Sequence, residues 1–260
     1  MPGIDPRAVV APGAELADDV RIGPFAVIGP EVKIGAGTEV SAHAMIEGRT
    51  VLGRDNWIGP FAYIGGPPQH VGYRGEDTGV VIGDRNRIRE CVTIHRGTAQ
   101  GRGETRIGSD CYIMVGSHVA HDCVVGERVI IANLTTLAGH VLVEDDVVLG
   151  GLVGVHQHCR IGCVVMVAAD AKLRKDVPPY ALVGGDPLVF LGLNRVGLKR
   201  VGVAEEIKVQ LRRAYRLIYG ENSLAAGLGK AEEAFGGVAE VRHVLEFFRG
   251  SKRGVIRSAK

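Results

Sequence analysis

Residues 22–64 read IGPFAVIGPEVKIGAGTEVSAHAMIEGRTVLGRDNWIGPFAYI, and an aliphatic residue occupies every sixth position of this stretch. Neither the 3.6-residue period of a helix nor the alternation of an ordinary strand produces such spacing. A repeat of six is typical of a hexapeptide solenoid, in which each repeat forms one short strand and one bend. The aliphatic positions that follow this period are Ile4, Val10, Leu16, Ile22, Ile28, Ile34, Val40, Ile46, Leu52, Ile58, Ile64, Ile82, Ile88, Ile94, Ile107, Ile113, Val119, Val125, Ile131, Leu137, Val143, Leu149, Val155, Ile161, Val167 and Leu173.

The period predicts a mainly β fold built as a parallel β-helix. Three six-residue sides close one triangular coil, each coil stacks on the next, and the aliphatic side chains point inward. The residue after the aliphatic one must fit a tight corner, and it is often glycine, as in Ile22-Gly23. The period is interrupted at about residues 65–81 and 95–106, which we expect to form loops that leave the coil and carry function.

The chain changes character after Pro178-Pro179, where the sixfold period stops. Apolar residues at helical spacing follow in residues 203–219 and 238–248, and Asn222-Ser223 can cap a helix between them. We therefore predict a hexapeptide-repeat domain over residues 1–187 and a helical C-terminal domain over residues 188–260.

Charge is unevenly distributed along the chain. Residues 188–260 hold 14 Lys and Arg against 7 Asp and Glu, whereas the whole protein has a net charge of +2. A basic end predicts an acidic partner, although a solvated helical face explains the charge equally well. No motif for nucleic-acid recognition, no membrane span and no signal peptide is recognisable. Five scattered cysteines favour a reducing cytoplasm, and we expect them to serve as small packing residues.

Five histidines fall within 41 residues, and their spacing is close to one coil of eighteen. His121, His140 and His158 should therefore stack along one face of the solenoid. Solvated surface residues, a zinc site and a general base are the alternatives. Histidine suits proton abstraction because its pKa lies near neutrality. Zinc needs three ligands around one point, which histidines on successive coils do not exclude. It is less favoured because the stretch His118-Val119-Ala120-His121 does not match the zinc pattern of hexapeptide solenoids, which has two histidines five residues apart and a third a coil or two away.

The motifs of the chain resemble those of the UDP-N-acetylglucosamine O-acyltransferases, which catalyse the first step of lipid A synthesis. The matching stretches are GDRNRIRECVTIHRGT (83–98), SHVAHDCVVG (117–126), TLAGHV (136–141), GGLVGVHQHCRIG (150–162), DVPPYALVGGDP (176–187), GLKRVG (197–202) and SKRGVIR (251–257). The resemblance implies a left-handed parallel β-helix, a homotrimer with active sites between neighbouring prisms, and an enzyme without metal or other cofactor. It also implies an acyl carrier protein as donor and a UDP-sugar as acceptor.

The resemblance also assigns roles to single residues. His121 would be the general base that deprotonates the sugar 3-hydroxyl, Asp122 would orient it or stabilise its cation, and the Gly139 N–H would stabilise the oxyanion. Neighbouring residues of a strand point to opposite faces, so a direct contact of His121 with Asp122 is not predicted. The residues expected to bind the substrate are His118, His140, His156, Gln157, Asn194, Arg200, His70 and Tyr73. Ala169 matches the residue that limits acyl length, and Lys252, Arg253 and Arg257 are expected to dock the acidic carrier protein.

The sequence departs from the family pattern around the sugar. Residues 69–73 read Gln-His-Val-Gly-Tyr, where the family usually has Gln-Asp-Leu-Lys-Tyr, and Val196 replaces a glutamate. These changes leave the 3-amino analogue of the sugar open as the acceptor. The alternatives are an N-acyl or acetyl-CoA transferase that acts on another nucleotide sugar, and a diverged solenoid without catalytic activity.

Overall fold

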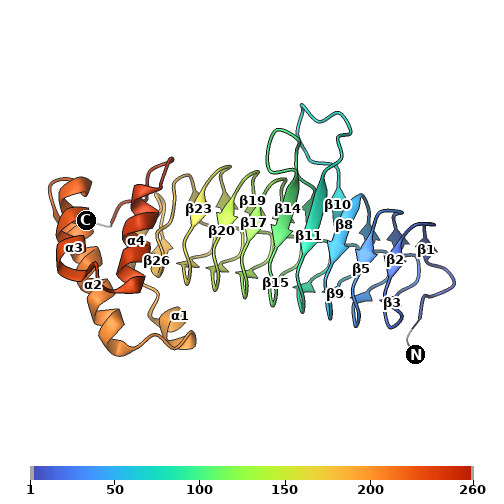
Figure 1. Ribbon diagram of the computed structural model, residues 1–260, viewed down its shortest axis with the longest axis horizontal. Coiled ribbons are helices and arrows are strands. Elements are labelled where there is room, and N and C mark those ends of the chain that lie inside the picture. The colour runs from blue at the N-terminus through green and yellow to red at the C-terminus, as the bar shows by residue number, and fades with distance from the viewer. Residues whose placement is uncertain (1–2, 259–260) are drawn as a thin grey trace.

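The computed structural model describes residues 3–258 and shows an elongated triangular prism that ends in a cluster of helices (Figure 1). Every coil contributes one short strand to each of three parallel sheets. Sheet I contains β1 (Val9–Val10), β4 (Val27–Ile28), β7 (Met45–Ile46), β10 (Tyr63–Gly66), β13 (Thr93–His95), β16 (His118–Val119), β19 (Thr136–Leu137), β22 (Gly154–Val155) and β25 (Lys172–Leu173). Sheet II contains β2 (Glu15–Leu16), β5 (Lys33–Ile34), β8 (Arg49–Leu52), β11 (Gly79–Ile82), β14 (Glu104–Ile107), β17 (Val124–Val125), β20 (Leu142–Val143) and β23 (Arg160–Ile161).

Sheet III is the longest and connects the prism to the helices. It contains β3 (Arg21–Ile22), β6 (Glu39–Val40), β9 (Trp57–Ile58), β12 (Arg87–Ile88), β15 (Tyr112–Ile113), β18 (Ile130–Ile131), β21 (Val148–Leu149), β24 (Met166–Val167), β26 (Ala181–Gly184) and β27 (Val189–Leu193). The final pair, β26 with β27, is antiparallel. Since β27 is still part of the sheet, the first helix begins at Arg195. The division into two domains at residue 188 stays a prediction.

The sixfold aliphatic positions form the core of the prism. Ile28, Ile46 and Ile64, from successive coils of sheet I, are completely buried. Burial of one such side chain is worth roughly 1.5–3 kcal/mol, and the ladder repeats it at every coil. The residue after the aliphatic one has to be small because the backbone of the next coil lies directly against it. A Cβ at Gly35 would lie 2.6 Å from the Gly53 carbonyl oxygen, which leaves no room for a side chain.

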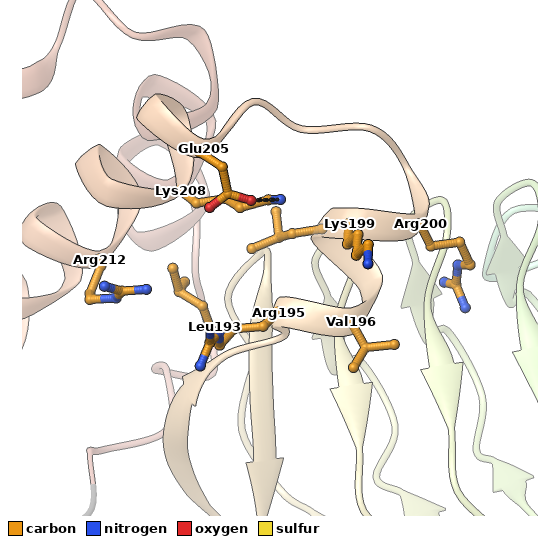
Figure 2. Close-up of a pocket in the computed structure, with 9 residues that line it drawn as sticks. Leu193, Arg195, Val196, Lys199, Arg200, Glu205, Lys208 and Arg212 are labelled. Carbon is orange, nitrogen blue, oxygen red and sulfur yellow. Dashed lines mark hydrogen bonds and ion pairs between the residues drawn. The ribbon is translucent and has the colours of Figure 1, made fainter.

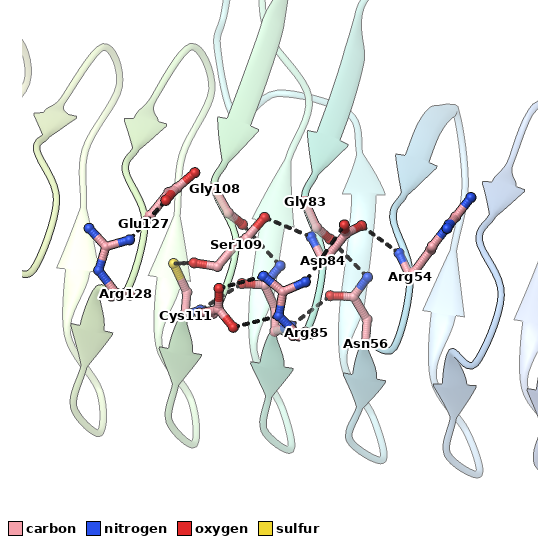
Figure 3. Close-up of polar contacts among 12 residues, drawn as sticks. Arg54, Asn56, Gly83, Asp84, Arg85, Gly108, Ser109, Cys111, Glu127 and Arg128 are labelled. Atoms are coloured by element: carbon pink, nitrogen blue, oxygen red, sulfur yellow. Dashed lines mark hydrogen bonds and ion pairs between the residues drawn. The ribbon is translucent and has the colours of Figure 1, made fainter.

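Buried polar side chains connect several coils at the corner between sheets II and III (Figure 3). Asn56 Nδ2 donates to the Gly83 carbonyl at 2.9 Å, and Asn86 Nδ2 donates to the Gly108 carbonyl at 3.0 Å. The Asn86 N–H in turn donates to Asn56 Oδ1 at 2.9 Å. Backbone groups that the turn leaves without a partner are satisfied in this way, as buried polar groups require.

Two loops leave the prism between neighbouring coils and lie side by side (Figure 1). The first, residues 67–78, connects β10 to β11, and the second, residues 96–103, connects β13 to β14. The Arg96 guanidinium of the second loop donates to the Tyr73 hydroxyl of the first at 3.0 Å. The register between β10 and β13 is 30 residues instead of 18, and the difference of 12 is the length of the first loop, residues 67–78.

Four helices cover the C-terminal end of the prism, namely α1 (Arg195–Arg200), α2 (Glu205–Gly220), α3 (Leu224–Phe235) and α4 (Ala239–Arg249). Their apolar faces turn inward, with Leu211 and Ile218 of α2 and Val244 and Phe248 of α4 buried. Ser223 caps α3 by accepting a hydrogen bond from the Ala226 N–H. Within the described residues, none of these helices has the length and apolarity needed to cross a bilayer.

Candidate active site

The AHDC motif lies in a turn at the corner between sheets I and II, which we name the histidine corner (residues 121–122, 139–140 and 157–158). His121 and Asp122 follow β16, and Asp122 has a φ of +62°, in the left-handed region. This turn brings both side chains to the same side, and His121 Nδ1 lies 2.8 Å from Asp122 Oδ2. The expectation of opposite faces is wrong, because it assumed a strand where the chain bends.

Asp122 is held as a buried carboxylate by the loop of residues 96–103. It accepts hydrogen bonds from the Thr98 hydroxyl at 2.7 Å and from the Arg102 backbone N–H at 2.7 Å. Gly101 is essential for this approach, since a Cβ there would lie 2.4 Å from the carboxylate. Burial would raise the pKa of Asp122, but the hydrogen bonds from Thr98, His121 and Arg102 outweigh it and lower the pKa. Asp122 therefore stays ionised.

An ionised Asp122 determines the state of the neighbouring imidazole. A carboxylate only accepts hydrogen bonds, so the nitrogen that faces it, His121 Nδ1, carries the proton. In the neutral ring Nε2 is then an acceptor, as a general base requires. The side chain of His121 is 10% exposed, and the residue lines the cleft described below.

The predicted histidine stack is present and extends beyond the three spaced positions. The ring centroids of His121 and His140 are 5.0 Å apart, and those of His140 and His158 are 4.5 Å apart. On the other side His70, from the loop of residues 67–78, places its ring 5.4 Å from that of His121. His140 Nε2 also approaches Asp122 Oδ2 to 3.8 Å.

His118 on β16 and His140 in the histidine corner remain neutral at physiological pH. Burial, followed by the neighbouring rings of His95 and His121, lowers the pKa of His118 to about 4. Burial also lowers the pKa of His140, although the Asp122 carboxylate opposes it. His118 Nδ1 lies 2.8 Å from the Thr93 hydroxyl, which fixes the ring against the wall of the cleft. His118 thus forms a neutral part of the cleft wall, whereas His140 lies in the histidine corner outside the cleft lining.

A cleft of about 540 Å³ opens along sheet I beside the histidine corner. Its lining includes His118, His121, Gly139, His156, Gln157 and Gln69. A Cβ at Gly139 would lie 2.5 Å from the His121 ring, so only glycine fits there. The Gly139 N–H makes no hydrogen bond within residues 3–258, which leaves it available to a ligand.

Residues 69–73, which the resemblance places near the sugar, differ in what they contact: some face the cleft and some contact the loops. His70 is exposed beside His121, and Gln69 reaches the cleft. Tyr73 is engaged within the loops, because its hydroxyl contacts Arg96 and donates to the Glu76 carbonyl at 3.1 Å. Gln69, which lines the cleft, was missed at the sequence level. The ring of His95, within the quoted motif of residues 83–98, lies 5.2 Å from that of His118.

The predicted nucleotide residues lie away from this cleft. Asn194 is buried as the N-cap of α1, where its side chain contacts the Gly197 N–H and the Val164 carbonyl. Arg200 donates to the Asp146 carbonyl at the corner between sheets II and III, a different edge of the prism from the histidine corner. Exposed Val196 and Arg200 line a separate pocket of about 860 Å³ between α1 and α2, shown in Figure 2. The other cations of this pocket are Arg195, Lys199, Lys208 and Arg212.

Four basic side chains, which we name the basic ridge, continue from the cleft toward the C-terminal segment; they are Lys172, Arg174, Lys175 and Arg257. Lys172 and Arg174 line both the histidine cleft and a neighbouring groove of about 560 Å³. The groove also includes Lys175 and Arg257. Arg253 donates to the Arg174 carbonyl at 3.3 Å, while Lys252 is exposed. The sequence predicted Lys252, Arg253 and Arg257 as docking residues, and their role stays a prediction. No charge run in the sequence marks the neighbouring cations of the last coil.

The acyl-length residue is not part of the cleft of a single chain. Ala169 is exposed on the corner between sheets III and I, and its backbone covers Gly150 of the preceding coil. Its predicted role stays a prediction.

His121, Asp122 and His140 bring possible metal-binding atoms within 4.8 Å of one another. The Asp122 oxygens are already occupied, however, by the donors of Thr98, Arg102 and His121. A cation would have to displace these hydrogen bonds, so the donor set fits an orienting carboxylate better than a metal ligand.

Comparison with known proteins agrees with this geometry. A family model for domain 2 of UDP-N-acetylglucosamine O-acyltransferase matches residues 176–256, and a bacterial transferase hexapeptide model matches residues 13–48 and 104–139. The crystal structure of the UDP-N-acetylglucosamine O-acyltransferase from Moraxella catarrhalis is 40% identical, with a TM-score of 0.93 over 98% of this chain and 99% of that chain. That of the enzyme from Francisella novicida is 37% identical, with a TM-score of 0.96 over 99% of this chain and 95% of that chain.

A third relative, the UDP-N-acetylglucosamine acyltransferase from Bacteroides fragilis, is 38% identical, with a TM-score of 0.94 over 97% of this chain and 99% of that chain. The predicted fold, a left-handed parallel β-helix with a helical C-terminal region, is confirmed. Identity and coverage of this extent show common descent over nearly the whole chain. The protein belongs to the UDP-N-acetylglucosamine O-acyltransferase family.

Proposed function

We propose that the protein transfers a 3-hydroxyacyl chain from acyl carrier protein to the 3-position of UDP-N-acetylglucosamine, or of its 3-amino analogue, in lipid A synthesis. The observation that carries the proposal is the His121–Asp122 pair, which contacts at 2.8 Å and opens into a cleft. A buried carboxylate that orients a histidine is the arrangement of a general base. Family membership supplies the class of reaction.

The mechanism follows from the atoms at the cleft. His121 Nε2 takes the proton of the acceptor hydroxyl or amine while the oxygen or nitrogen of that group attacks the thioester carbonyl. Asp122 stabilises the imidazolium that forms. The Gly139 N–H, which has no partner within residues 3–258, donates to the tetrahedral oxyanion. Collapse of this intermediate breaks the carbon–sulfur bond, and His121 returns the proton to the leaving thiolate. No covalent acyl-enzyme is needed.

We propose that the active enzyme is a homotrimer. In one chain the histidine cleft and the pocket of Arg200 lie at different edges of the prism, so a second copy is needed to place both around one nucleotide sugar. An exposed apolar ridge supports such contacts. It follows the corner between sheets III and I and consists of Phe25, His43, Phe61, Leu134 and Leu152, with Phe25 and Phe61 stacked on either side of His43. Side chains this apolar gain free energy when a neighbouring copy covers them.

We propose that the basic ridge docks the acyl carrier protein. Lys172 and Arg174 border the cleft itself, so a partner bound there delivers its thioester next to His121. Acidic carrier proteins are attracted to such a surface, mainly through the association rate. The free state of all five cysteines is consistent with work in the cytoplasm.

The test is an assay of product mass with purified protein. UDP-N-acetylglucosamine and its 3-amino analogue are each paired with a 3-hydroxyacyl carrier protein and with the matching acyl-CoA. We expect an acylated nucleotide sugar with the carrier donor. Transfer only from acyl-CoA would favour the alternative acyl-CoA transferase, and lack of any transfer would favour a diverged solenoid.

A further inference from the structure

A second group of titratable side chains lies at the junction of the prism and the helices, away from the histidine cleft. Glu144 follows β20 and Cys163 follows β23, both at the corner between sheets II and III, and His243 lies on α4. Cys163 Sγ is 3.7 Å from His243 Nδ1, and His243 Nε2 is 3.0 Å from Glu144 Oε2. The imidazole is thus in contact with a thiol through one nitrogen and with a carboxylate through the other.

The carboxylate is fixed on its other side as well. Glu144 Oε2 accepts the Cys163 backbone N–H at 2.8 Å, so the residue that carries the thiol also holds the acid that orients the imidazole. The side chains of His243 and Glu144 are 36% and 31% exposed, and Cys163 is half-buried. Small reagents therefore have access to the cluster.

Two tyrosines also interact with the thiol. Burial raises the pKa of Tyr180, whose hydroxyl bonds to Cys163 and stays protonated. Burial likewise raises the pKa of Tyr215 on α2. Glu240 on α4 adds negative charge on the side of Tyr180. Neither tyrosine adds a negative charge at neutral pH.

The cluster favours the charged form of the histidine. Contact with Cys163, followed by that with Glu144, raises the pKa of His243 to about 10. A cationic imidazole beside a thiol stabilises the thiolate, and the thiolate is the reactive form of cysteine. A carboxylate behind the imidazole holds the ring in place, as in other thiol–imidazole pairs that act as nucleophiles.

We propose that Cys163 is a modification site, a thiolate paired with the His243 imidazolium that reacts with small electrophiles and hydroperoxides. With a hydroperoxide, the sulfur attacks the terminal oxygen and the O–O bond breaks. The departing alkoxide takes the Nδ1 proton of His243 and leaves as the alcohol. The sulfur is oxidised by two electrons to a sulfenic acid while the peroxide is reduced.

The test is the pH dependence of alkylation at Cys163 in the full-length protein. Peptide mass spectrometry follows iodoacetamide labelling at pH 6.5 and pH 8.5. A thiol with the ordinary pKa of about 8.5 would react roughly fiftyfold faster at the higher pH, because its thiolate fraction rises by that factor. Cys163 should accelerate much less than fiftyfold, because His243 Nδ1 lies 3.7 Å from its sulfur and a cationic imidazole there stabilises the thiolate.

His243→Gln removes the cation and should restore the steep rise of the Cys163 alkylation rate from pH 6.5 to pH 8.5. With Glu144→Gln, this rise should lie between that of the wild type and that of His243→Gln. A second measurement treats the wild-type protein with hydrogen peroxide and traps sulfenic acid with dimedone. We expect the label on Cys163 before the exposed Cys91. A roughly fiftyfold acceleration at Cys163 in the wild type, or dimedone on Cys91 alone, would overturn the proposal, whatever the variants show.

Discussion

Asp122→Asn tests the central pair with a minimal change of shape. The carboxylate contacts His121 Nδ1 at 2.8 Å and also accepts from Thr98 and Arg102. Asparagine keeps the size of the side chain and tolerates the left-handed φ of +62° at this corner. The charge that stabilises the His121 imidazolium is lost, and the amide NH₂ has to face hydrogen-bond donors.

The expected loss follows from the electrostatics of the pair. Two unit charges about 4 Å apart interact by on the order of 4 kcal/mol at an effective dielectric constant of 20. A barrier that rises by this amount corresponds to a roughly thousandfold lower kcat, at about 1.36 kcal/mol per factor of ten. KM should change little, because the imidazolium exists only after the proton has moved. Loss of charged hydrogen bonds to the loop should also lower the free energy of unfolding by about 2–3 kcal/mol.

The assay measures steady-state kcat and KM with a saturating carrier donor, together with Tm and the oligomeric state. Asp110→Asn is the matched control, since Asp110 lies at another corner with a φ of +60° and pairs with Arg85. This control should retain wild-type kcat. If Asp122→Asn retains kcat within tenfold of the wild type while it remains folded, the proposed role of the carboxylate is refuted.

The remaining predictions concern the base, the partner, the assembly and the sugar. His121→Ala should lower kcat by about 10²–10⁴-fold with an unchanged thermal transition, and near-normal turnover would contradict its role as general base. Arg174→Glu or Arg257→Glu should raise KM for the carrier protein and flatten its dependence on salt, whereas a salt-independent wild-type KM would contradict docking by charge. Light scattering should return about 83 kDa, roughly three times the 27.6 kDa chain, and an active monomer would contradict the trimer. His70→Asp with Gly72→Lys should improve kcat/KM for UDP-N-acetylglucosamine relative to the 3-amino analogue, and a wild type that already prefers the former strongly would remove the basis for this expectation.

The repeat of six was sufficient to predict the coil, because every sixth side chain is apolar and the interior of the prism is the place where all of them are removed from water. Ile28, Ile46 and Ile64 are buried for the same reason at each level of the prism. The same periodicity placed His140 and His158 on neighbouring coils, and their rings stack at 4.5 Å. Local chemistry that repeats with the coil can therefore be predicted from spacing alone.

The His121–Asp122 contact could not be obtained in this way. It depends on a left-handed residue at the corner and on the loop of residues 96–103, which supplies the Thr98 and Arg102 donors. Non-glycine residues rarely adopt positive φ, so a strand-based expectation assigns the two side chains to opposite faces. The left-handed corner repeats with the coil, since Asp122, His140 and His158 share a φ near +60° and lie one coil apart.

Contacts between the prism and the helices were the least predictable, because they join segments far apart in the sequence. Cys163 looked like small apolar filler, and for the buried Cys111, Cys123 and Cys159 that expectation agrees with their burial. Its contact with His243 spans 80 residues and depends on how α4 docks against the last coils. The basic ridge has the same origin, since Arg257 reaches the groove of Lys172 and Arg174 only after the C-terminal segment has returned to the prism. The period of the coil predicts which residues share a face, but the sites that combine both parts of the chain depend on the docking of helices that carry no such period.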